Sequence, residues 1–114
     1  MIEISKIGGE MGAWREVSER PGKEPFAKEA EYKVQDLFWG KIHLRNTGEL
    51  YVLVISKIPF NWKEKLKDLK LHGEVVDAAG GIMWIRTDEP HAIDDMSTIK
   101  DFLLKIKSDS SPKK

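Results

Sequence analysis

Six consecutive apolar residues, Leu-Tyr-Val-Leu-Val-Ile at positions 50–55, constrain the fold more than any other part of the chain. Successive side chains of a strand point to opposite faces, so a strand with this sequence is apolar on both faces. We therefore expect a central strand that is covered on each side, by the rest of the chain or by a partner chain. The run is far shorter than the roughly 20 apolar residues that span a bilayer, and no membrane insertion is expected.

A β-hairpin is predicted to lead into this strand. Residues 41–45 alternate between apolar and polar side chains, which is the period of a strand. Residues 46–48, Asn-Thr-Gly, have the composition of a hairpin loop, and a second strand over residues 50–58 follows. Residues 1–7 also alternate as a strand, whereas residues 10–28 are rich in Gly, Pro and charge and are expected to form a loop.

Helices are expected in three further segments. Residues 26–39 fit a helical stripe as well as a strand, and we favour the helix. Asn61 and Glu64 have the residue types of a capping box, which predicts a helix that runs to about Leu71. The last helix, with Asp94, Asp95 or Ser97 as its cap, has apolar residues at helical spacing, namely Ile99, Phe102, Leu103 and Ile106.

Between these helices, residues 74–77 and 82–87 have strand character and flank Ala-Ala-Gly-Gly. They form either a hairpin or one long strand with a glycine bend. The elements together predict a single α+β domain over residues 1–107, an antiparallel sheet of about four or five strands with two or three helices, ferredoxin-like. We expect residues 108–114, which are polar, to form a disordered C-terminal tail.

Charge and cysteine content exclude several classes of protein. The chain has 19 Lys and Arg against 19 Asp and Glu, and this zero net charge argues against a nucleic-acid partner. Without cysteine there is no disulfide, no thiolate nucleophile and no Cys-type zinc site. The N-terminal residues lack the pattern of a signal peptide, so a cytoplasmic location is expected. Abundant Lys, Glu and Ile fit the ion-paired surface of a thermophile protein.

Residues that carry catalysis or bind metal are not evident, and we expect no catalytic, cofactor-binding or metal-binding residue. His43, His72 and His91 lack the spacing of zinc ligands on a helix. The glycines lack the spacing of a nucleotide-binding loop, and the serines lack that of a nucleophile elbow. A metal-dependent enzyme that uses His91 and Asp94 is the least favoured hypothesis.

The aromatic content points instead to an interface. Four Trp, four Phe and two Tyr are a heavy load for a domain of 114 residues, and the surplus fits a subunit interface. Val52 and Val54 of the doubly apolar strand are candidate interface residues. Trp84 and Arg86, which share one face of a predicted strand, are candidates for a ligand or an interface.

A longer pattern resembles a known family. Residues 50–59 form a strand that ends in Pro, a short predicted helix follows, and Asp77, Gly80, Gly81 and Trp84 come next. This stretch is similar to the C-terminal region of the small FAD-linked subunit of glycolate oxidase, in which a segment of the form Asp-x-Gly-Gly-x-x-Trp follows a strand and a helix. In that family an FAD-binding domain precedes this region, and here only residues 1–40 precede it.

The resemblance implies a non-catalytic cap or substrate-side module of a flavin-linked oxidoreductase. Such a module acts through protein association and binds no cofactor by itself, with FAD on a partner chain. It also implies that Asp77, Gly80 and Gly81 are candidate ligand or interface residues. The alternative hypothesis is a self-associating domain, a dimer in the simplest case, or a small-ligand-binding domain unrelated to flavins.

Overall fold

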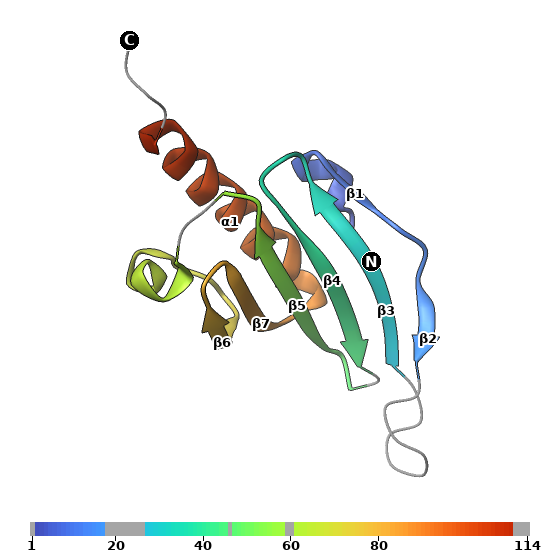
Figure 1. Ribbon diagram of the computed structural model, residues 1–114. Coiled ribbons are helices and arrows are strands. Elements are labelled where there is room, and N and C mark those ends of the chain that lie inside the picture. The colour runs from blue at the N-terminus through green and yellow to red at the C-terminus, as the bar shows by residue number, and fades with distance from the viewer. Residues whose placement is uncertain (1, 18–26, 46, 59–60, 111–114) are drawn as a thin grey trace.

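The computed structural model describes residues 2–17, 27–45, 47–58 and 61–110, which form an antiparallel sheet backed by a long helix (Figure 1). The strands are β1 (Gly9–Met11), β2 (Arg15–Val17), β3 (Ala27–Val34), β4 (Phe38–Arg45), β5 (Glu49–Ser56), β6 (Glu74–Ala79) and β7 (Ile82–Asp88). The helical elements are the 3-10 turns η1 (Ile4–Ile7), η2 (Trp62–Glu64) and η3 (Leu66–Asp68), and the α-helix α1 (Glu89–Ser110).

The strands lie in the order β1-β3-β4-β5-β7-β6, and β2 pairs with β3 beside β1. Every pairing is antiparallel. The hairpin of β6 and β7 returns to the sheet so that β7 lies beside β5, which places β5 in the interior of the sheet. An interior position is the one that its doubly apolar sequence favours.

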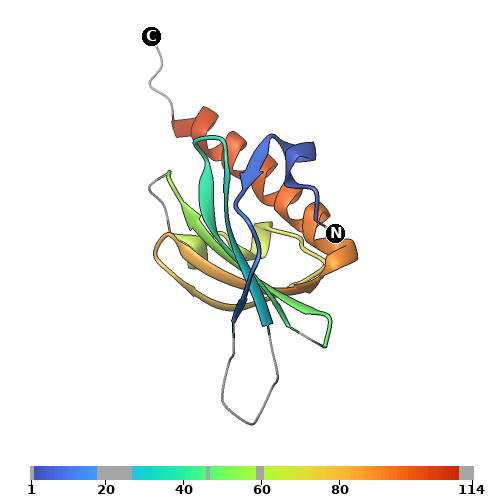
Figure 2. The same cartoon turned by 90° about the vertical axis from the view of Figure 1, so that its right-hand side faces the viewer.

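The helix α1 and the turn η1 lie on the same side of the sheet (Figure 2). The helix buries Ala92, Met96, Ile99 and Leu103, which recur at intervals of three or four residues and so form one stripe. They pack on alternate side chains of the strands, chiefly Tyr32, Val34, Phe38, Ile42, Leu50, Val52, Val54, Met83 and Ile85. The core of the protein therefore lies between the sheet and α1.

The start of α1 follows β7 without a loop. The Asp88 carboxylate accepts a hydrogen bond from the backbone N–H of His91 at 3.0 Å, which caps the helix. Pro90 lies in the first turn, where a missing N–H costs nothing. The predicted last helix is therefore present, but it begins earlier than expected and is capped by Asp88 rather than by Asp94, Asp95 or Ser97.

The ferredoxin-like prediction, with four or five strands and two or three helices, is wrong. The described residues hold seven strands in one sheet and a single α-helix. The main error is in the helix expected over residues 26–39, because β3, a turn and the start of β4 form residues 27–39, and residue 26 lies outside the described residues. Ala30, Tyr32 and Val34 are buried between exposed charged residues, so the period of two dominates over the helical stripe.

Other predicted elements also differ. Within the loop expected over residues 10–28, β1 ends at Met11, Arg15–Val17 form β2 and β3 begins at Ala27, while residues 18–26 lie outside the described residues. Over residues 61–71 the structure forms η2 and η3 instead of a helix, although the Asn61 side chain does accept from the Lys63 N–H at 3.0 Å. Residues 4–7 form η1 rather than a strand, because Ile4 and Ile7 are both drawn into the core. The polar segment from residue 108 belongs to α1 as far as Ser110, and residues 111–114 lie outside the described residues.

Both hairpins are observed. Strands β4 and β5 pair across the predicted loop. Of the two alternatives left open for residues 74–87, the hairpin is correct, since β6 and β7 pair and Gly80 adopts φ +57° in the turn between them. Glycine adopts this left-handed conformation without steric cost.

Candidate functional site

The face of the sheet opposite α1, here called the open face, is the candidate functional site. Figure 1 looks onto it, with α1 passing behind the strands. No described segment of the chain packs over this face. Its centre is an apolar patch made of Trp39, Tyr51, Leu53, Ile55, Ile82 and Trp84. Trp39 is 45% exposed and Ile82 is 47% exposed, and the two belong to one contiguous apolar surface rather than to scattered positions.

The patch arises from the doubly apolar sequence of β5. Leu50, Val52 and Val54 point toward α1 and are at most 2% exposed. The alternate residues Tyr51, Leu53 and Ile55 point the other way and remain half-buried. Val52 and Val54, named as interface candidates from the sequence, therefore belong to the core of this chain. The apolar side chains of β5 that are accessible to a partner are those of Tyr51, Leu53 and Ile55.

Cross-strand pairing arranges the open face in three rows. The first row is Lys33, Trp39, Ile55, Ile82 and Ala79, and the third is Glu29, His43, Tyr51, Arg86 and Glu74. The second row consists of the pair Glu31 and Lys41 and of the residues Leu53, Trp84 and Asp77, which the flanking pairs of β4 and β5 align. The apolar side chains occupy the middle of the first two rows. Charged residues of both signs stand at the ends, so the face has an apolar centre and a polar rim, as protein interfaces do.

Ion pairs hold the rim in place. Arg86 pairs with Glu74 on the neighbouring strand. Glu29 pairs with Arg15 and lies 3.7 Å from the Lys41 Nζ. The hydrogen bond from Arg15, together with the nearby positive charges, holds the pKa of the Glu29 carboxyl below its ordinary value, although partial burial opposes this shift. The Glu29 carboxyl is therefore ionised at neutral pH.

Gly40 on β4 allows β3, β4 and β5 to pack closely at the level of the first two rows. A Cβ on Gly40 would lie 1.9 Å from the Leu53 carbonyl oxygen, closer than any real contact. The Tyr32 ring crosses Gly40, and its hydroxyl donates a hydrogen bond of 2.8 Å to the same oxygen. Burial raises the pKa of the Tyr32 phenol well above its ordinary range, so the hydroxyl keeps its proton.

The residues of the family-like motif separate into two groups. Asp77 and Trp84 pair across β6 and β7 on the open face, with Arg86 in the next row. Gly80 and Gly81 form the β6–β7 turn instead. There the Trp62 ring N–H donates to the Gly81 carbonyl at 2.9 Å, and the backbone N–H of Trp62 donates to the Gly80 carbonyl. The carbonyl groups of the two glycines thus accept hydrogen bonds from Trp62 of the same chain.

A hollow of about 510 Å³ lies at one corner of the open face. Trp39 and Lys57 line one side of it, and Met11, Glu10 and Lys33 line the side toward β1. Glu10 and Lys33 are 3.8 Å apart as an ion pair. This corner is where a small ligand would bind under the alternative hypothesis made from the sequence.

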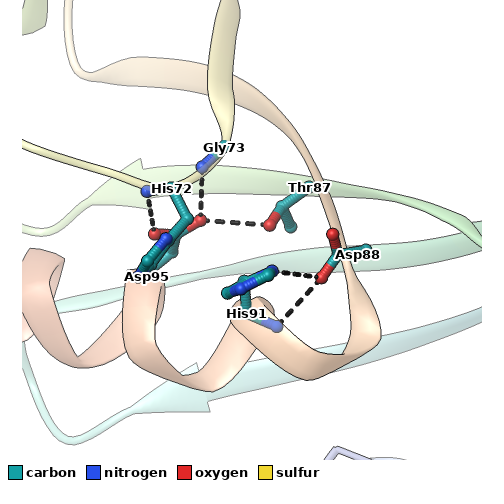
Figure 3. Close-up of polar contacts among 6 residues, drawn as sticks. All are labelled: His72, Gly73, Thr87, Asp88, His91 and Asp95. Atoms are coloured by element: carbon teal, nitrogen blue, oxygen red, sulfur yellow. Dashed lines mark hydrogen bonds and ion pairs between the residues drawn. The ribbon is translucent and has the colours of Figure 1, made fainter.

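A second polar cluster lies at the start of α1 (Figure 3). Asp95, only 2% exposed, accepts hydrogen bonds from the backbone N–H groups of His72 at 2.7 Å and Gly73 at 2.9 Å, and from the Thr87 hydroxyl at 3.1 Å. These contacts tie the segment before β6 to α1 and to β7. Asp95 therefore has a structural role that the helix-cap prediction missed.

Two histidines complete this cluster. The rings of His72 and His91 are stacked with their centroids 4.4 Å apart, and His91 Nδ1 lies 2.8 Å from an oxygen of Asp88. Burial alone raises the pKa of the Asp88 carboxyl, but hydrogen bonds from His91 and the charges of both histidines outweigh it, and the pKa lies below its ordinary value. No sequence spacing indicates the stacking, because 18 residues separate the two histidines.

Across residues 2–17, 27–45, 47–58 and 61–110, no three His, Asp or Glu side chains are grouped so as to hold a metal ion. None of the helices in these ranges is long and apolar enough to cross a membrane. Asp94, the other residue of the least favoured enzyme hypothesis, is exposed on α1, whereas His91 points to Asp88.

Searches of protein-family models, curated proteins and solved structures found no match to this chain.

Proposed function

We propose that the chain is a non-catalytic protein-association module that binds a second copy of itself through the open face. The observation that carries this proposal is the apolar patch, which lies on the face of the sheet away from α1. Trp39 and Trp84 belong to the patch, and tryptophan is enriched among the interface residues that carry most of the binding energy. Water in contact with these side chains is released when a partner covers them.

The size of the open face supports a protein occupant. Strands β3 to β7 lie about 4.8 Å apart and the three rows about 7 Å apart, so the footprint is roughly 25 by 20 Å. This flat footprint of about 500 Å² is of the same order as the roughly 800 Å² that each partner buries in a standard stable interface.

The charges of the rim support a second copy as that occupant. The rim carries Lys33 and Lys41 together with Glu31 and Asp77, so one surface supplies both members of an ion pair. A surface that is complementary to itself is what a two-fold symmetric dimer requires. Two sheets that pack face to face at about 10 Å form a β-sandwich, which is a common stable arrangement.

The experiment compares two apolar-to-acidic substitutions. Leu53→Asp introduces a charge at the centre of the patch, whereas Leu104→Asp does so at an exposed position of α1. Size-exclusion chromatography with light scattering should give a dimer for the wild type and for Leu104→Asp, and a monomer for Leu53→Asp. Circular dichroism checks that both variants are folded. A monomeric wild type at every concentration tested would rule out the proposal.

A flavoprotein is the alternative occupant of the same face. It follows from the resemblance to the glycolate oxidase small subunit, which stays a prediction, and from the position of Asp77 and Trp84 beside each other on the open face. A purified FAD-bearing oxidase subunit, titrated into the wild type and into Leu53→Asp, tests it. Binding by a monomeric wild type that Leu53→Asp abolishes would favour the flavoprotein over the second copy.

A further inference from the structure

The rows of the open face define how a second copy can sit on it. We infer that two copies meet face to face about a two-fold axis that runs across the strands, midway between the first row and the second. This inference rests on the proposed self-association and adds to it a specific register. Under this axis each strand lies over its own copy, and each residue of the first row meets the second-row residue of the same strand.

The apolar centre is continuous in this arrangement. Ile55 meets Leu53 of the partner subunit, and Ile82 meets Trp84 of the partner subunit. The axis repeats each of these contacts, so Trp39 and Ile82, the two most exposed side chains of the apolar patch, are both covered. Trp39 meets Lys41 of the partner subunit, and an ammonium group over an indole ring is a favourable contact.

The ends of the rows are complementary in charge. Lys33, which lies 3.8 Å from Glu10 of its own chain, meets Glu31 of the partner subunit, and the symmetry forms this contact twice. At the other end Ala79 meets Asp77 of the partner subunit, where no like charge opposes the carboxylate. The long side chains at the rim can span two sheets that are packed about 10 Å apart.

Other two-fold axes bring like charges together. An axis midway between the second and third rows places Glu31 opposite Glu29 and Asp77 opposite Glu74. An axis along β5 places Glu31 opposite Asp77, and Glu29 opposite Glu74. Like charges that face each other across an interface disfavour that arrangement strongly. Of the three axes, the one between the first and second rows avoids every such clash.

Two charge reversals test this register. Lys33→Glu alone places the new carboxylate against Glu31 of the partner subunit, and Glu31→Lys alone places two ammonium groups together. We expect each variant to dimerise about tenfold more weakly than the wild type, because each clash occurs twice. Mixed in equal amounts, the two variants relieve both kinds of clash in the heterodimer, where one contact pairs the two original residues and the other pairs the two reversed ones.

The readout is the fraction of heterodimer, measured by native mass spectrometry with one variant isotopically labelled. We expect well over the half that random assortment gives. The contacts within each chain are the same in homodimer and heterodimer, so a mere loss of stability cannot produce this preference. The control pair is Lys105→Glu with Asp101→Lys on the exposed side of α1, which should assort at random.

The outcomes distinguish a failure of the proposed register from a failure of self-association. If the wild type dimerises and Leu53→Asp does not, but the Lys33 and Glu31 variants dimerise normally and mix at random, the register is wrong and self-association stands. If the wild type is monomeric, self-association fails and the register fails with it. A heterodimer preference at the Lys33 and Glu31 pair alone supports both.

Discussion

Leu53 and Trp84 lie directly opposite each other on β5 and β7, on the face of the sheet that α1 leaves uncovered. Cross-strand neighbours of this kind support each other's position and present one continuous apolar surface. The pair sits at the middle of the second row of the open face, with Ile55 and Ile82 beside it in the first row. The proposed self-association depends on this surface.

Trp84→Ala should weaken the dimer more than it weakens the fold. Trp84 lies outside the core between the sheet and α1, and central interface tryptophans cost about 2 kcal/mol or more when truncated. The dissociation constant of the dimer, from sedimentation velocity, should rise at least tenfold. Leu104→Ala on α1 serves as the control and should leave it unchanged. An unchanged constant in Trp84→Ala would place the interface elsewhere.

Asp95→Ala should destabilise the fold strongly. It leaves two backbone N–H groups and the Thr87 hydroxyl without their acceptor at a position that is 2% exposed. A loss of about 3 kcal/mol in the free energy of unfolding is expected, measured by urea denaturation. Asp94→Ala, on the neighbouring exposed position of the helix, should change it little. Equal effects of the two substitutions would show that Asp95 does not hold β6 to α1.

Gly40→Ala should be among the most damaging single-methyl changes in the chain. The added Cβ would meet the Leu53 carbonyl oxygen at 1.9 Å, so β4 and β5 must separate. We expect a loss of about 3 kcal/mol, comparable to overpacking of a tight core. Gly12→Ala is the control, since its Cβ would meet the nearest atom at an ordinary 3.7 Å. A Gly40→Ala protein as stable as Gly12→Ala would contradict the close approach.

Asp88 should make the free energy of unfolding depend on pH in the acidic range. Its pKa in the folded chain lies below the ordinary value of about 4, so the folded state favours the ionised carboxylate. This contribution is fully present above the ordinary pKa and disappears as the pH falls through the folded-state pKa. Urea denaturation should therefore show Asp88→Asn less stable than the wild type at neutral pH, with the gap closing in acid. A gap that is constant with pH would exclude a role for the charge.

Sequence patterns predicted the pairing of the strands better than the identity of the helices. The hairpin whose loop contains Gly48 could be predicted because strand alternation and turn residues are local signals. At Gly80 the same signals left the hairpin as one of two alternatives, and the pairing of β6 with β7 decides between them. Residues 27–34 were assigned wrongly because a short apolar pattern fits both periods, and only pairing with β1, β2 and β4 decides between them.

The site was predicted only in part. The run at residues 50–55 correctly indicated a strand with two apolar faces, and Trp84 and Arg86 do lie on the open face. Which face α1 covers depends on contacts between distant segments, so the sequence could not distinguish Val52 and Val54 from Leu53 and Ile55. The contact of Trp62 with the Gly80–Gly81 turn, and the stack of His72 on His91, likewise arise only when the chain is folded.

The molar mass of the wild-type protein in solution tests the central claim most directly. Sedimentation equilibrium over a wide range of concentrations should give a mass that rises from that of one chain, 13.1 kDa, to twice that value and then stops. Such a plateau is the signature of a closed two-fold dimer. A mass that stays at one chain throughout, or one that rises without limit, would contradict self-association through the open face.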